Sequence, residues 1–132
     1  MIRISTPTVA VALKITAVVN VVAALGALLA PGVNASLFLG PDVVMEGLLL
    51  RHHVLVWSTV LAMGLGYAIA SRDPEGQTGL LVAAGFGKLS VAVVWLEMVF
   101  GGLGAVTLLG GVVFDGVFGL LFLGYVWQQW RA

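Results

Sequence analysis

Residues 79–127 read GLLVAAGFGKLSVAVVWLEMVFGGLGAVTLLGGVVFDGVFGLLFLGYVW, two apolar runs separated by a short glycine-rich link. The hydrocarbon layer of a bilayer is about 30 Å thick, and about 20 apolar residues cross it as a helix. Both runs are long enough, so membrane spans are predicted over residues 79–100 and 105–127. The link, Gly101-Gly102-Leu103-Gly104, is so short that the two helices must be antiparallel neighbours.

Two further apolar runs, over residues 8–30 and 48–70, precede this pair. The first ends at Pro31-Gly32, a common stop signal for a helix, and the second ends in the polar stretch 71–76. The connection between these two runs, residues 31–47, is predicted to be a loop because it is rich in turn-forming residues. Residues 1–132 are therefore predicted to form one all-α domain, a four-helix transmembrane bundle.

The first run has a rival interpretation as a cleaved secretory signal, because Arg3 precedes it and small residues end it. Its length, the interruption by Lys14 and the lack of a small-x-small site before Pro31 favour a retained span instead. We expect four spans on this basis.

The composition indicates a lipid environment. Of the 132 residues, 61% are hydrophobic and 9% are charged, which is more apolar surface than so small a water-soluble domain could bury. The formal net charge is zero with no run of like charges, which argues against nucleic acid as a partner. Cysteine is absent, so disulfides, thiolate metal sites and thiol catalysis are excluded.

The positions of arginine predict the orientation in the membrane. Outside the predicted spans, Arg3 precedes the first span, Arg72 lies between the second and third, and Arg131 follows the fourth. In a protein with four spans, these three places lie on the same side of the membrane. The connection over residues 31–47 carries no lysine or arginine. Because positive charge stays inside, both termini and the Arg72 turn are predicted to be cytoplasmic.

Small residues recur at helical spacing in the last three runs. These stripes are Ala62, Gly66 and Ala70, then Ala83 and Gly87, then Gly116 and Gly119. Such spacing lets membrane helices approach closely. Tight packing within the chain is favoured over a dimer motif, and a homo-oligomer is left open.

Two ionisable residues lie near the middle of adjacent predicted helices, Lys88 in the third run and Asp115 in the fourth. An unpaired charge at that depth is costly, so the two side chains are predicted to face each other inside the bundle. Asn20 lies at a similar depth in the first run and could add a hydrogen bond to this buried polar pair. A structural role in fixing helix register is favoured over a proton or ion relay.

A second polar group, Arg51, His52, His53 and Glu97, supplies the candidate catalytic residues in the outer half. Successive helical residues are 100° apart, so the first three cannot all face one neighbour. One arrangement turns Glu97 toward the second helix, where it meets Arg51 or a histidine. In the alternative, Arg51 and Glu97 extend to the outer headgroups.

No metal site and no cofactor are predicted. Adjacent helical histidines point apart, and one of them with Glu97 offers too few ligands for a closed zinc site. Haem ligation by His52 or His53 and binding of a quinone are left open. The G-x-S-x-G, P-loop and H-E-x-x-H motifs are absent from the sequence.

A spaced set of residues carries a resemblance to a known group of proteins. The set comprises Arg51-His52, Gly64-Leu65-Gly66-Tyr67-Ala68, Asp73-Pro74-Glu75, Gly85-Phe86-Gly87-Lys88 and Asp115 near Phe118. Over roughly residues 46–125 the chain resembles small uncharacterised bacterial four-helix membrane proteins and is loosely similar to DoxX-like proteins. The resemblance implies the bacterial inner membrane and an accessory subunit linked to quinone-dependent sulfur redox complexes.

Three functions follow as hypotheses. The first is an accessory or structural membrane protein whose buried charges hold helices in register or dock a partner. The second is a small membrane enzyme that acts on a lipid-like or quinone substrate in an outer-leaflet pocket. The third is an oligomeric proton-coupled transporter with Lys88 and Asp115 on its path. The sequence does not decide whether the protein is an enzyme.

Overall fold

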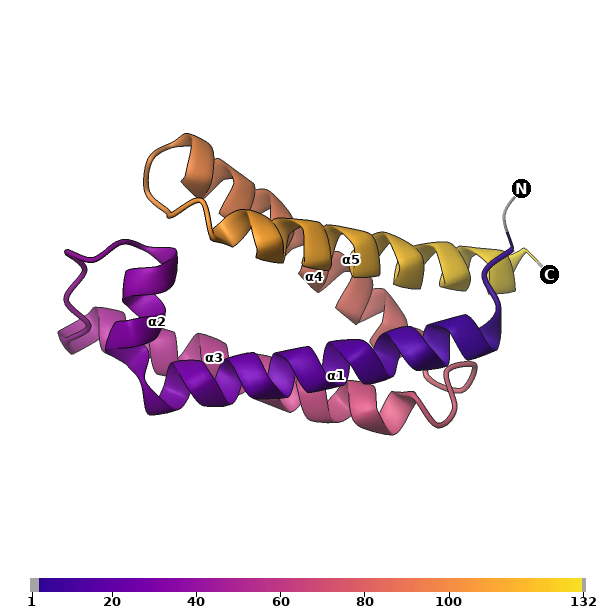
Figure 1. Ribbon diagram of the computed structural model, residues 1–132. Helices are drawn as coiled ribbons and strands as arrows, with labels where there is room; N and C mark the ends of the chain where they lie inside the picture. The colour runs from indigo at the N-terminus through magenta and orange to yellow at the C-terminus, as the bar shows by residue number, and fades with distance from the viewer. Residues whose placement is uncertain (1–2, 132) are drawn as a thin grey trace.

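The computed structural model describes residues 3–131 as an all-helical protein (Figure 1). The four long helices are α1 (Thr6–Leu29), α3 (Gly47–Ala70), α4 (Thr78–Phe100) and α5 (Leu108–Trp130), and the short helix is α2 (Pro31–Phe38). Each long helix has 23 or 24 residues and is apolar enough to cross a membrane. The predicted all-α fold with four transmembrane helices is confirmed.

The connection over residues 31–47 differs from its prediction, because its first part forms the helix α2. Pro31 ends α1 since proline has no N–H to continue the hydrogen-bond ladder. The same proline occupies the first turn of α2, where a missing N–H has no cost. The stop signal after α1 is therefore also a start signal, and the expectation of a simple loop was wrong for residues 31–38.

The turn between α4 and α5 is held by backbone hydrogen bonds that end α4. Gly102 has φ +71°, a left-handed conformation that favours glycine. Its neighbour Leu103 donates its N–H to the carbonyl of Met98 at 2.9 Å, and Gly102 donates to Val99 at 3.3 Å. This is the Schellman arrangement. It reverses the chain within a few residues and makes α4 and α5 antiparallel.

The long helices form two antiparallel pairs, α1 with α3 and α4 with α5 (Figure 1). The two pairs converge at the end that carries both termini and the α3–α4 turn, which we call the inner end. They diverge toward the opposite end, where α2 lies, which we call the outer end. Arg3, Arg72 and Arg131 all belong to the inner end, so the three arginines outside the long helices lie on one side of the membrane; that this side is cytoplasmic stays a prediction.

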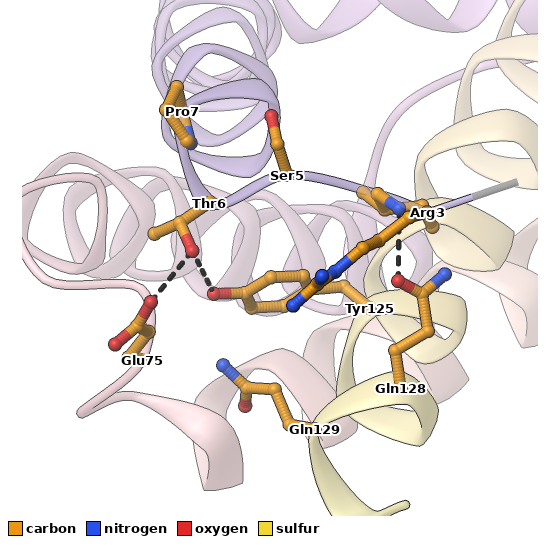
Figure 2. Close-up of a pocket in the computed structure, with 9 residues that line it drawn as sticks. Arg3, Ser5, Thr6, Pro7, Glu75, Tyr125, Gln128 and Gln129 are labelled. Carbon is orange, nitrogen blue, oxygen red and sulfur yellow. Dashed lines mark hydrogen bonds between the residues drawn. The ribbon is translucent and has the colours of Figure 1, made fainter. Parts of the chain in front are cut away.

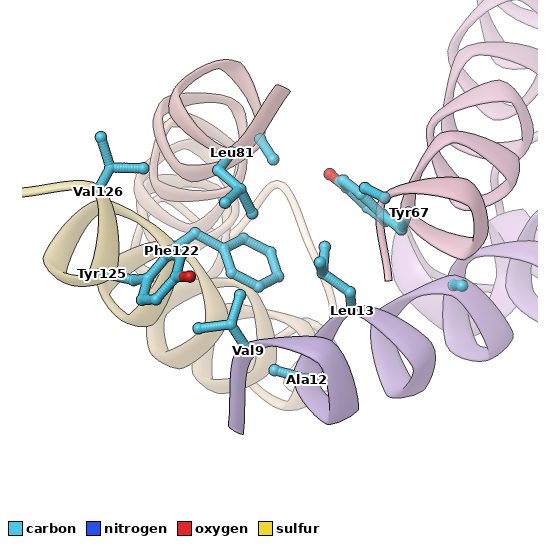
Figure 3. Close-up of a cluster of buried hydrophobic side chains, with 11 residues drawn as sticks. Val9, Ala12, Leu13, Tyr67, Leu81, Phe122, Tyr125 and Val126 are labelled. Atoms are coloured by element: carbon cyan, nitrogen blue, oxygen red, sulfur yellow. The ribbon is translucent and has the colours of Figure 1, made fainter. Parts of the chain in front are cut away.

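Figure 3 shows the buried hydrophobic core. It lies in the inner half of the molecule. Its members are Val9, Ala12, Leu13 and Ala17 of α1, Tyr67 and Ala70 of α3, Leu81 and Ala84 of α4, and Phe122, Tyr125 and Val126 of α5. All come from the inner parts of their helices. The four helices are thus packed together at one end only.

Large apolar side chains cover the outside of every long helix. Val18, Leu65, Phe86 and Leu120, one from each, are 63%, 56%, 61% and 65% exposed. So extensive an apolar surface is incompatible with water and matches the acyl chains of a bilayer. The protein is a small multi-pass integral membrane protein.

Glycines bring α4 and α5 together at Gly85 and Gly119. A Cβ built on Gly119 would lie 3.0 Å from the carbonyl oxygen of Gly85, and one on Gly85 would lie 2.5 Å from Cγ of Leu123. In contrast, a Cβ on Gly87 or Gly116 would meet nothing within 4 Å. Of the glycines in the predicted stripes of α4 and α5 (Gly87, Gly116 and Gly119), only Gly119 lies at a close helix contact within the chain.

Candidate functional site: the membrane-embedded ion pair

The structure brings Lys88 and Asp115 together: Nζ of Lys88 donates a hydrogen bond to Oδ1 of Asp115. The side chains are only 6% and 13% exposed. Both lie about one turn outward from the contact between Gly85 and Gly119, so the absence of side chains there brings the two backbones close enough for pairing. It is the one ion pair within residues 3–131.

Aromatic rings surround the ammonium group of Lys88. Its Nζ lies 4.9 Å from the ring centre of Phe114 and 5.8 Å from that of Tyr67. The Tyr67 ring is in turn 6.1 Å from the ring of Phe122, in the core. The faces of such rings attract a cation, and they add to the stabilisation that Asp115 supplies. The charge is therefore compensated by Asp115 and by two aromatic rings.

Tyr67 is a site residue that sequence reasoning missed. It lies near the inner end of α3, but it is only 3% exposed and its ring links α3 to Lys88 of α4. The one signal in the sequence that singles it out is its place in the Gly66-Tyr67-Ala68 element of the resemblance.

Asn20 does not join the ion pair: within residues 3–131 no hydrogen bond connects it to Lys88 or Asp115. It packs instead against α3, where a Cβ on Gly64 would lie 3.1 Å from Cβ of Asn20. One turn further in, Thr16 is fully buried and its Oγ1 has no hydrogen-bond partner in the described part of the chain. The face of α1 that is turned toward the other helices thus carries two polar side chains, Thr16 and Asn20, near the middle of the membrane.

His53 hydrogen-bonds to a carbonyl that Pro31 leaves without a donor. The N–H of residue 31 would normally bond to the carbonyl of Ala27, but proline has none. Nε2 of His53 lies 3.0 Å from that carbonyl oxygen and donates to it across the α1–α3 interface. His52 is exposed, and its Nδ1 forms a hydrogen bond of 3.0 Å to the carbonyl oxygen of Leu48 in its own helix.

Of the two arrangements considered for the outer-half residues, the one in which Glu97 meets Arg51 or a histidine is not formed. Arg51, His52 and Glu97 are exposed, and no hydrogen bond or ion pair joins the four candidate residues anywhere in residues 3–131. Exposed side chains near the outer ends of α3 and α4 fit the alternative, in which Arg51 and Glu97 extend to the headgroups. Nor does the described part of the chain hold three metal-ligating side chains close enough to share an ion.

His53→Ala is expected to destabilise the protein by about 1–3 kcal/mol, because it leaves the carbonyl of Ala27 buried at a helix contact without a donor. His52→Ala is the matched control and should change stability by less than about 0.5 kcal/mol. The free energy of unfolding in detergent mixtures measures both. Equal losses in the two variants would contradict the role given to His53.

Fold and site together define a small multi-pass membrane protein built from two helix pairs, one of which is locked by an internal ion pair. Comparisons with family models, with curated proteins and with solved structures find no match to this chain.

Proposed function

We propose that this protein is an accessory subunit of a membrane complex and that its two helix pairs hold a transmembrane helix of a partner between their outer halves. The observation that carries the proposal is the position of the core, which joins all four long helices only at the inner end. The bacterial inner membrane and a redox-linked complex are the setting that the resemblance to DoxX-like proteins suggests.

The contacts of the short helix α2 indicate the direction from which a partner helix would enter. Ala105, in the turn before α5, donates its N–H to the carbonyl of Phe38 at 2.8 Å, and the Thr107 hydroxyl donates to the carbonyl of Leu37. The Phe38 ring also stacks on Trp95 of α4, with ring centres 6.3 Å apart. These contacts bridge the two helix pairs at the outer end, while the core joins them at the inner end. A partner would approach between them from within the bilayer.

Asn20 favours a protein over a lipid acyl chain in this position. Leu13, Thr16 and Asn20 follow one another at a spacing of three to four residues, so they lie on one face of α1, the face turned toward the other helices. Leu13 and Thr16 are buried there, but Asn20 is only half-buried. An amide within a membrane span is stabilised by a hydrogen bond from another helix, which a hydrocarbon chain cannot supply. No such bond to Asn20 is present within residues 3–131.

The ion pair has a structural role in this proposal. Lys88 and Asp115 each compensate the other, and the rings of Tyr67 and Phe114 complete the enclosure. Such a pair fixes the register of α4 against α5 and so keeps that helix pair intact where it separates from α1 and α3. The enzyme hypothesis gains no support, because Arg51, His52 and Glu97 are not assembled into one site.

Site-specific photo-crosslinking in native membranes tests the proposal. A photoreactive residue at position 20 is expected to capture one membrane protein in equimolar amount. The same residue at position 18, on the 63% exposed outer face of α1, is the matched control and should capture lipid. Capture of lipid alone from both positions would contradict the proposal. Capture of a second copy of this chain from position 20 would replace it with self-association.

A further inference from the structure

A polar recess of about 400 Å³ opens at the inner end, between the segment before α1 and the last turns of α5 (Figure 2). This volume falls in the range of small-molecule sites, roughly 300–1,000 Å³. Six polar or charged side chains that line it are Arg3, Thr6, Glu75, Tyr125, Gln128 and Gln129. None of them belongs to the ion pair or to the outer half, so the recess is independent of the proposed function.

A chain of hydrogen bonds fixes one wall of the recess (Figure 2). The Thr6 hydroxyl donates to Oε1 of Glu75 at 2.7 Å. Since its single proton is used there, Thr6 accepts from the Tyr125 hydroxyl at 3.0 Å. Three segments far apart in the sequence are joined in this way, and the Glu75 carboxylate is held at the edge of the recess.

Two glutamine amides near the end of α5 are oriented as well. Oε1 of Gln128 accepts the N–H of Ile4 at 2.9 Å. The Thr78 hydroxyl lies 3.1 Å from the carbonyl oxygen of Glu75 and 3.3 Å from Oε1 of Gln129, so these two acceptors share its one proton. In this orientation Gln129 presents its amide nitrogen, a hydrogen-bond donor, toward the recess (Figure 2).

Opposite charges stand on the two sides of the recess. Figure 2 shows Arg3 and Glu75 approaching it from opposite sides. No ion pair joins them within residues 3–131. A recess with a cation on one side and an anion on the other is complementary to a ligand that carries both charges. The negative group of such a ligand would bind Arg3, and its positive group would bind Glu75.

We propose that this recess binds a phosphoethanolamine group, with the phosphate on Arg3 and Gln129 and the ammonium on Glu75. The planar guanidinium and the amide N–H groups suit phosphate oxygens, and the fixed carboxylate suits the three N–H donors of a primary ammonium. Gln128 and Gln129, which line the recess, are flanked in sequence by Trp127, Trp130 and Arg131, residue types that mark the membrane interface. Phosphatidylethanolamine of the cytoplasmic leaflet and free phosphoethanolamine share this chemistry.

Native mass spectrometry of the full chain in mild detergent tests the proposal with three lipids of matched acyl chains. Phosphatidylethanolamine is expected to bind about tenfold more tightly than phosphatidylglycerol, which lacks the ammonium, the size of effect given by one charge-assisted hydrogen bond. Phosphatidylcholine, whose ammonium has no N–H, should also bind more weakly. Binding of free phosphoethanolamine at equal affinity would assign the site to the soluble compound, and weaker binding would assign it to the lipid.

Matched variants separate the recess from general attraction at the membrane surface. Arg3→Gln should lower the affinity for phosphatidylethanolamine about tenfold. Arg131→Gln, at the same end but with its guanidinium 4.3 Å above the Trp127 ring, should leave it unchanged. Glu75→Gln keeps the acceptor for Thr6 and should abolish the preference over phosphatidylglycerol. Equal losses in Arg3→Gln and Arg131→Gln, or equal binding of the three lipids, would overturn the proposal.

Discussion

Lys88→Met alone is expected to lower the free energy of unfolding by about 3–5 kcal/mol, because it leaves the Asp115 carboxylate buried without a partner. Asp115→Val alone should cost a similar amount, since it isolates the Lys88 ammonium. The double variant Lys88→Met/Asp115→Val replaces both charges with apolar side chains and should recover most of the loss. Reversible unfolding in detergent mixtures gives all three values.

Lys14→Met is the matched control for this series. Lys14 also lies within a membrane-spanning helix, but its side chain is exposed and can extend to the inner interface. Its replacement should change stability by less than about 0.5 kcal/mol. If the double variant were as unstable as the sum of the two single ones, Lys88 and Asp115 would not act as a pair.

Gly119→Val is expected to cost about 3 kcal/mol, at the upper end of the effect of overpacking. The new Cβ would lie 3.0 Å from the carbonyl oxygen of Gly85 and 2.9 Å from Cγ of Leu89. A side chain can move aside, but the backbone of α4 cannot do so without separating the two helices. The same measurement of unfolding reports the loss.

Gly116→Val controls for the change of residue type. Gly116 lies one turn away on α5, and a Cβ there would meet no atom within 4 Å. We expect a change below about 0.5 kcal/mol, because the side chain there has room even though Gly116 is half-buried. Similar losses at the two positions would show that α4 and α5 do not cross where the structure has them.

The sequence predicts the long helices well because their signal is strong. The predicted span 48–70 differs by one residue from α3, and 79–100 differs by one from α4. The last span was predicted three residues early, over 105–127, and α5 continues to Trp130. Hydropathy alone could not place this helix, because the turn and helix start are set by hydrogen bonds from the backbone of Ala105 and Leu108.

The ion pair could be predicted from depth, since two charges at one level on antiparallel neighbours have few other partners. The residues that surround the ion pair could not be predicted in this way. Whether Tyr67 faces the core or the interface depends on the rotation of α3 against α4, which hydropathy does not encode. In the same way, His53 finds its partner only because α1 ends beside it at Pro31.

The divergence of the two helix pairs was also beyond prediction. Apolar residues occur along all four spans, so the pattern gives no sign that the core stops at the inner half. In lipid, an apolar side chain gains little by moving from acyl chains to a helix interface. Which helices pack closely is therefore decided by fit, as at Gly85 and Gly119, rather than by hydrophobicity.

The measurement that most directly tests the pairing of Lys88 with Asp115 is solid-state NMR of the protein in lipid bilayers. With ¹⁵N in lysine Nζ and ¹³C in aspartate Cγ, strong dipolar dephasing is expected for Asp115, and it should vanish in Lys88→Met but persist in Lys14→Met. No dephasing of Asp115 in the unaltered protein would show that the two charges do not meet. The register of α4 against α5 and the structural role of the site would then both be wrong.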